Sequence, residues 1–237
     1  MANDFLQVVG VGDDGQLWHT IRNADGSWTP RFGLIKGESS GGPPTFTDVS
    51  CGNFGGQALQ VAGVGNDGQL WHTIRNADGT WTPRFGLIEG ESSGGPGKFT
   101  DVACGSADGL ALQVVGVGDD GQLWHTIRNA DGTWTPGFGL IESVSVGGSW
   151  KFNMVGCAGT EGGPFIVRVG NPTLQVIGVG SDGQLWHTIR NADGTGRLAS
   201  SSSKVYHPAG LQPLNSSVAL PQAQILSFRK TANSAEF

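Results

Sequence analysis

Short runs of apolar residues, each closed by a turn rich in glycine and aspartate, recur along the chain at a regular interval. The segment that starts at Leu6 reads LQVVGVGDDGQLWHTIRN, and it returns from Leu59, Leu112 and Leu174 with sixteen of its eighteen positions unchanged. Valine, isoleucine, threonine and aromatic side chains dominate these runs, which is typical of β-strands. Helical periodicity is absent from the repeated part. The pattern therefore predicts an all-β protein.

The tryptophan inside the repeated segment gives the period. Trp18, Trp71 and Trp124 fall 53 residues apart, and Trp186 follows after 62 residues because nine extra residues enlarge a loop within Gly159–Thr173. Strand-rich repeats with a period of about 40–50 residues are typical of propeller blades. We therefore predict a β-propeller of about four repeats, each a four-stranded antiparallel blade.

Each full repeat contains four strand candidates, which in the third repeat are Phe99–Gly105, Ala111–Gly118, Gln122–Asn129 and Thr133–Ile141. Sequences such as Asp-Asp-Gly and Asn-Ala-Asp-Gly join the strands, and Asp-Gly tolerates the positive φ that tight hairpin turns require. Apolar side chains occur on both faces of the second strand. This arrangement fits a blade that is packed between two neighbouring blades.

The repeat boundaries predict a propeller body over residues 1–195 and a divergent tail over 196–237, with repeats near 1–45, 46–98, 99–151 and 152–195. The first repeat lacks its first strand, and the fourth repeat lacks its last strand. We expect the tail to close the ring by supplying both strands, with Val205–His207 and Gln224–Arg229 as candidates. The alternative is a foreign tail and a ring that closes through a second chain, as a homo-oligomer.

Composition and charge narrow the function classes. The 41 glycines among 237 residues follow the turns of the repeats. The net charge is −6, and the tail alone carries four basic groups against one acid, so the body is strongly acidic. An acidic body repels phosphate backbones, and nucleic acid is therefore not an expected partner.

The start of the chain, MANDFLQVVG, has no basic region, apolar core or cleavage site of a secretory signal. No apolar run approaches the roughly 18 residues of a membrane helix, so membrane insertion is not expected. The three cysteines, Cys51, Cys104 and Cys157, are again 53 residues apart, and we expect buried free thiols on inner strands. A cytoplasmic protein, or one exported without a recognisable signal peptide, fits these features.

The string DGQLWHTIRNADGSWTP resembles the blade motif of bacterial lectins of the Photorhabdus type, and more loosely that of propeller lectins such as tachylectin-2. The resemblance covers about 195 residues. It implies a propeller that binds fucose, galactose or related sugars between adjacent blades. The chain differs in having about four repeats, where the nearest members of that group have seven, and in having longer connectors.

A sugar site needs a flat aromatic surface for the apolar face of the ring and a few fixed hydrogen-bonding groups for the hydroxyls. Every repeat carries a tryptophan in its third strand, which serves either as a stacking platform or as blade packing: Trp18, Trp71, Trp124 and Trp186. The first three repeats carry a second tryptophan just after a turn, nearer an outer rim, as a further candidate platform: Trp28, Trp81 and Trp134.

Two more residue types complete the candidate sugar-binding set. The arginines near the strand ends either donate paired hydrogen bonds to hydroxyls or hold a turn aspartate in a salt bridge: Arg22, Arg75, Arg128 and Arg190. The histidines either pack against the blade with a bond to the backbone or contact the ligand: His19, His72, His125 and His187.

No metal site or cofactor is expected. One histidine per blade does not form a ligand cluster, because equivalent positions diverge around a ring. The Asn-Ala-Asp-Gly turns offer too few oxygens for calcium, so we interpret them as turns only.

The repetition also argues against an enzyme, because catalysis needs a unique, asymmetric group of residues, whereas the polar residues here are copied in every repeat. The predicted function is a multivalent lectin for fucose-, galactose- or N-acetylhexosamine-type glycans on cell surfaces. The alternative function is a non-catalytic propeller scaffold for protein–protein interaction. A scaffold is expected to diversify its exposed positions between blades, which this chain does not do.

Overall fold

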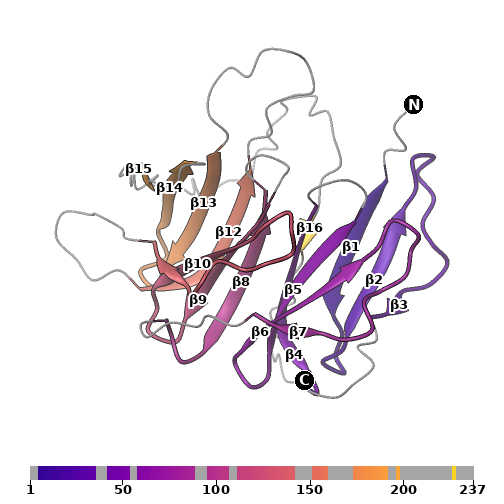
Figure 1. The fold of residues 1–237 in the computed structure, drawn as a ribbon, viewed down its shortest axis with the longest axis horizontal. Helices are drawn as coiled ribbons and strands as arrows, with labels where there is room; N and C mark the ends of the chain where they lie inside the picture. The colour runs from indigo at the N-terminus through magenta and orange to yellow at the C-terminus, as the bar shows by residue number, and fades with distance from the viewer. Residues whose placement is uncertain are drawn as a thin grey trace, which may run out of the picture.

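The computed structural model describes residues 5–35, 42–53, 58–88, 95–106, 111–141, 151–159, 173–191, 196–197 and 226–227. These residues form sixteen strands in four sheets, and this part of the chain contains no helix (Figure 1). Accordingly, no described segment is a helix long and apolar enough to span a membrane. The predicted all-β class is confirmed.

The first sheet contains β1 (Leu6–Val11), β2 (Leu17–Arg22), β3 (Gly33–Leu34) and β16 (Leu226–Ser227). The second contains β4 (Phe46–Asn53), β5 (Leu59–Gly65), β6 (Leu70–Arg75) and β7 (Gly86–Leu87). The third contains β8 (Phe99–Gly105), β9 (Leu112–Gly118), β10 (Leu123–Arg128) and β11 (Gly139–Leu140). The fourth contains β12 (Phe152–Gly159), β13 (Thr173–Gly180), β14 (Leu185–Asn191) and β15 (Gly196–Arg197). The strand orders are β16-β1-β2-β3, β4-β5-β6-β7, β8-β9-β10-β11 and β12-β13-β14-β15.

The hairpin turns form as their sequences require. The glycine that ends each described Asp-Gly turn has a positive φ, for example 80° at Gly68 and 89° at Gly79. In the Asn-Ala-Asp-Gly turn of the second sheet, Oδ1 of Asp78 accepts bonds from the backbone N–H (2.9 Å) and the hydroxyl (2.7 Å) of Thr80. The same contacts recur in the first and third sheets. The acidic side chain is therefore used by the turn itself, as predicted.

Consecutive sheets pack face to face and make the blades of a β-propeller. The first strand of each blade lies against the preceding blade: β4 contacts β1, β8 contacts β4 and β5, and β12 contacts β8 and β9. The first blade lies at the right of Figure 1 and the fourth at the left, so the described blades follow one another along an arc. An apolar core fills each of the three junctions between consecutive blades.

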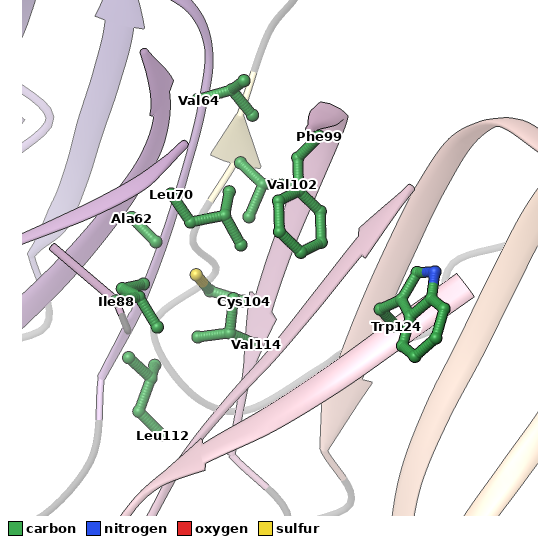
Figure 2. Packing of buried hydrophobic residues seen from close by; sticks show 10 residues of the cluster. All are labelled: Ala62, Val64, Leu70, Ile88, Phe99, Val102, Cys104, Leu112, Val114 and Trp124. Carbon is green, nitrogen blue, oxygen red and sulfur yellow. The ribbon is translucent and has the colours of Figure 1, made fainter. Parts of the chain in front are cut away.

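The core between the second and third blades shows how the repeat builds a junction (Figure 2). Ala62, Leu70 and Ile88 come from the second blade, and Phe99 and Val114 come from the third. Trp134 and Phe138 of the third blade pack on the edge of this core. The two faces of a blade pack in two different junctions, and for this reason its strands carry apolar side chains on both faces.

The three cysteines lie on the innermost strands and are free. Cys51 and Cys104 are buried, and Cys157 is half-buried. Burial raises the pKa of the Cys104 thiol to about 12. The predicted free thiols on inner strands are confirmed, with less complete burial in the fourth blade.

The fourth strand of each blade departs from the prediction. In the third blade the expected strand Thr133–Ile141 is reduced to a single bridge between Arg128 and Trp134 and the two residues of β11. Pro136 has no N–H to donate, and Gly137 has a φ of 72°, so an extended ladder cannot continue between these points. Leu140 then pairs with Trp124.

The tail contributes to both end blades. β16 lies within the predicted candidate Gln224–Arg229 and pairs with β1 through Val8 and Val9, but it runs parallel rather than antiparallel. The last strand of the fourth blade is β15, at the start of the tail, and not a later segment. The other candidate, Val205–His207, lies outside the described residues.

Buried aspartates tie neighbouring blades together. Oδ2 of Asp48 accepts a bond from the backbone N–H of Val102 in the next blade (2.9 Å), and Oδ2 of Asp101 accepts one from Val155 (2.7 Å). Both carboxylates are buried. Because a buried polar group is costly when unpaired, each bond fixes the register between two blades.

Replacing Asp48 with alanine is expected to lower the free energy of unfolding by about 1–3 kcal/mol, since the buried N–H of Val102 loses its acceptor. Asp48→Asn keeps an acceptor oxygen and should cost less. Urea unfolding measures both, with Asp119→Ala as the control, because Asp119 is exposed and its loss changes the net charge equally. Equal stability of the Asp48→Ala and Asp119→Ala proteins would contradict the role of this bond.

Candidate binding sites between consecutive blades

A histidine–glutamine pair stands at the same place in every blade, buried in the first three blades and half-buried in the fourth. His Nε2 and Gln Oε1 are 3.0 Å apart for His19 and Gln7, and 2.7 Å apart for His72 and Gln60. The distances are 2.6 Å for His125 and Gln113, and 2.7 Å for His187 and Gln175. The histidines pack within the blades, but their partner is a glutamine side chain and not the backbone that the sequence led us to expect.

The next blade covers this pair with a tryptophan and an arginine. The rings of His19 and Trp81 are 5.4 Å apart and nearly perpendicular (80°), and those of His72 and Trp134 have the same separation at 85°. These tryptophans are half-buried, so part of each indole remains open to solvent. The structure thus brings together residues that the sequence predicted separately, and it draws them from two blades.

The arginine of the next blade lies close enough to act on the histidine. Burial, with a smaller contribution from the charge of Arg75, lowers the pKa of His19 to about 4. Burial and the Arg128 charge lower the pKa of His72 to about 3, and burial and the Arg190 charge do the same for His125. The three imidazoles are therefore neutral near pH 7.

The junction between the third and fourth blades shows how the hydrogen bonds run. Nη1 of Arg190 donates to Oε1 of Gln113 over 3.4 Å. A guanidinium can only donate, so this oxygen is an acceptor, and His125 must donate to it through Nε2–H. The histidine–glutamine pair is thus a fixed, uncharged floor at the junction.

Arg75 and Arg128 keep donors available. Both are half-buried, and within the described part of the chain neither forms an ion pair within 4 Å, although each charge lowers the pKa of its turn aspartate as a minor cause after the threonine bonds. The salt-bridge alternative is therefore wrong for these two residues. A guanidinium has five N–H donors, which suits the hydroxyls of a neutral polyol.

The mid-strand tryptophans have a different role. The indole N–H of Trp71 donates to Asp67 in the preceding turn (3.2 Å), and Trp124 bonds to Asp120 in the same way (3.2 Å). Both side chains are buried in the junction cores. Trp18 makes the equivalent bond to Asp14, and Trp186 packs on the third core. A stacking platform needs an open face, so of the two alternatives offered by the sequence, blade packing is the one that fits Trp71 and Trp124.

The glutamines were missed from the sequence. They occupy the second position of every repeated LQV segment, where a polar residue between apolar neighbours is unchanged in all four copies. Gln7, Gln60 and Gln113 are buried. A polar residue that stays unchanged in all four copies of an apolar strand was the feature of the sequence that could have identified these glutamines.

The four copies of the constellation are not equally complete. Trp28, Trp81 and Trp134 each bridge to the arginine six residues earlier, and Gly196 pairs with Arg190 at this position in the fourth blade. The third junction therefore has the glutamine, the histidine and the arginine but no tryptophan. In the first blade, Trp28 and Arg22 are exposed, whereas Trp81 and Arg75 of the second blade are half-buried.

The constellation suits binding of an uncharged ligand. It offers part of an indole surface, a guanidinium with free donors and a rigid amide–imidazole floor. Among the described residues, no group of three or more His, Cys, Asp or Glu side chains is placed to hold a metal ion.

No protein-family model and no curated protein matches the chain. Several solved structures do. A triple arginine-to-alanine mutant of AofleA from Arthrobotrys oligospora has a TM-score of 0.59 and 16% identity, over 85% of this chain and 54% of that chain. The BP39L lectin from Burkholderia pseudomallei has a TM-score of 0.54 and 21% identity, over 84% and 55%. The chain thus spans about half the length of these proteins.

Two further structures bear on function. An Aleuria aurantia lectin mutant, in complex with Fucα1-6GlcNAc, has a TM-score of 0.53 and 15% identity, over 87% of this chain and 64% of that chain. A mutant of the NanB sialidase from Streptococcus pneumoniae has a TM-score of 0.54 and 14% identity, over 78% of this chain and 28% of that chain. At these identities the likeness shows the propeller fold alone, and it agrees with the blades described above.

Proposed function

We propose that this protein is a multivalent lectin that binds glycans at the junctions between consecutive blades. The observation that carries the proposal is the repeated constellation of an arginine and a half-open tryptophan over a histidine–glutamine pair. It is complete at two junctions, with Arg75 and Trp81 at the first, and Arg128 and Trp134 at the second. The indole takes the apolar face of a sugar ring, and the guanidinium donates to its hydroxyls.

Fucose-type sugars are the first candidates among the fucose, galactose and N-acetylhexosamine classes. The Aleuria aurantia lectin, which shares the fold, was solved with a fucose-containing disaccharide. In the AofleA mutant the three exchanged arginines are 53 residues apart, the spacing at which Arg22, Arg75 and Arg128 recur here. Both points support, for this chain, an arginine-centred site that is repeated from blade to blade.

Equivalent sites on one rigid scaffold favour binding to clustered glycans. A site of millimolar affinity supplies only about 4 kcal/mol, whereas simultaneous engagement of several sites raises avidity by about 10²–10⁴. A protein-interaction scaffold is less well supported, because its contact residues are expected to differ between blades. A sialidase-like activity is not proposed, since the described residues of the constellation are copies of one another and include no carboxylate.

A glycan array probed with the purified protein tests the proposal. We expect binding to fucosylated glycans that free fucose abolishes and that glucose, as an unrelated hexose, leaves intact. Competition by galactose or N-acetylglucosamine instead would keep the lectin and change its sugar class. An array without signal, from protein whose circular dichroism shows an intact β-fold, would contradict the proposal and favour the scaffold.

A further inference from the structure

Four of the six large apolar side chains that are exposed in the described chain lie in the two blades at the ends of the arc. Trp28 and Phe32 of the first blade are 50% and 56% exposed, and Met154 and Ile177 of the fourth blade are 41% and 49% exposed. The other two, Leu87 and Leu140, lie on the short outer strands β7 and β11. The end blades thus each present an apolar face that the inner blades bury.

The open face of the first blade is the one that, in later blades, receives the preceding blade. Phe85 and Phe138 stand at the positions of Phe32, and they pack into the first and second junction cores. Trp81 and Trp134, at the positions of Trp28, do the same. No described blade precedes the first one, so its copies of these residues are exposed.

The open face of the fourth blade is the complementary one. Val9, Ala62 and Val115 stand at the position of Ile177, and each is buried in the core that its blade shares with the next blade. Leu17, Leu70 and Leu123 are buried in the same way, whereas Leu185 at this position is only half-buried. Each end of the arc is therefore one half of a junction that the chain already forms three times.

We propose that the fourth blade of one chain docks on the first blade of a second copy, and so repeats the junction between consecutive blades. The contact joins two different surfaces, so it is head to tail: two chains close a ring if the rotation permits, and further chains add if it does not. A second copy is the occupant that the repeat itself specifies, because the two halves of the junction are already complementary within the chain.

One difference between the repeats favours this contact between two copies of the chain. Asp48 and Asp101 bond to a backbone N–H on the first strand of the next blade, and Met154 replaces the aspartate in the fourth blade. In the first blade this place in the sheet is taken by β16, which pairs parallel to β1 for two residues only. Among the described residues, the first blade thus has no antiparallel strand at the place that supplies the N–H in other blades, and an apolar side chain leaves no buried carboxylate without a partner.

The contact between two copies would also complete a sugar-binding site at the fourth blade. This inference rests on the proposed function. Gln175 and His187 of the fourth blade form the usual pair over 2.7 Å, but no arginine or tryptophan of a following blade covers them in the described chain. The exposed Arg22 and Trp28 of a second copy are the missing half. The junction between two chains would then be as complete as the first and second junctions, and more complete than the third.

Light-scattering masses of single-end variants test the proposal without any sugar. Phe32→Arg blocks the first face, Ile177→Arg blocks the second, and Leu140→Arg (44% exposed) introduces the same change away from both. The wild type and Leu140→Arg are expected at twice the 24.6 kDa chain mass or more. Each end variant alone is expected at one chain mass, and an equimolar mixture of the two at two chain masses, because one matched pair of faces remains intact.

Three results would overturn the proposal. The first is a wild-type mass of one chain up to about 100 µM, where micromolar association is saturated. The second is an end variant that keeps the wild-type mass, which would indicate association of like faces. The third is a mixture that stays at one chain mass although circular dichroism shows both variants folded. Assembly without sugar binding would refute the proposed function and leave this contact standing.

Discussion

Replacing Arg75 and Arg128 together with alanine is expected to abolish measurable fucoside binding at the first and second junctions. A hydrogen bond to a charged group contributes about 1.5–3 kcal/mol, so each site should weaken by about 10- to 100-fold. Titration calorimetry with methyl α-L-fucoside measures the loss. The lysine variants keep the charge but lose the planar fork, and they should bind with intermediate affinity.

Arg31 and Arg84 provide a matched control for this experiment. They are also 53 residues apart and exposed, and they do not belong to the histidine–glutamine constellation. Their double alanine variant removes the same charge and should bind as the wild type does. If the Arg31 and Arg84 variant lost binding while the Arg75 and Arg128 variant kept it, the site would lie elsewhere on the blades.

Mild acid is expected to destabilise the protein between about pH 6.5 and pH 4. The pKa values of His19, His72 and His125 fall from 6.5 in the unfolded chain to about 4, 3 and 3 in the fold. The unfolded state therefore binds more protons in this window, so the stabilisation is complete above pH 6.5 and is lost as the pH falls. Each histidine contributes at most about 1.4 kcal/mol per pH unit to this slope, and the three together at most about 4 kcal/mol per pH unit.

Urea unfolding between pH 7 and pH 5 measures this slope. The pKa values of Asp14, Asp25, Asp78 and Asp131 are lowered from 3.8, mainly by hydrogen bonds within their turns, so these groups stay ionised throughout the window. His72→Gln removes one of the three titrating groups and should reduce the slope by about a third. A free energy of unfolding that does not change between pH 7 and pH 5 would contradict neutral, buried imidazoles.

The sequence was sufficient to predict the blade and its turns. Near-identical copies made the period plain, and a positive φ at glycines such as Gly68 follows directly from the Asp-Gly turn. The second and third strands of the third blade agree with β9 and β10 to within one residue at each end. These features depend on local chemistry, which a single repeat contains in full.

The candidate site was only partly predictable, because it belongs to two blades. Arg75, Trp81 and His72 occur in one repeat, yet His19 of the preceding blade is the histidine that Trp81 packs against. A single repeat does not specify which neighbour a side chain faces. The same reason separates the buried Trp71 from the half-open Trp81, since the junction core and not the residue type decides their exposure.

The shortness of the fourth strand and the exposure of apolar residues in the end blades could not be predicted from the sequence, for other reasons. Proline and a left-handed glycine interrupt the ladder between Trp134 and β11, which the β-forming residues around them concealed. The exposure of Trp28 and Ile177 comes from their place at the ends of the arc, where equivalent apolar positions of the repeat meet a different environment.

A crystal structure of the protein with methyl α-L-fucoside is the most direct test of the central claim, that the junctions between consecutive blades bind sugar. We expect the sugar ring against Trp81 with a hydroxyl bonded to Arg75, and an equivalent molecule at Trp134 and Arg128. A sugar bound only away from these junctions, or none at a concentration that saturates binding in solution, would contradict that claim.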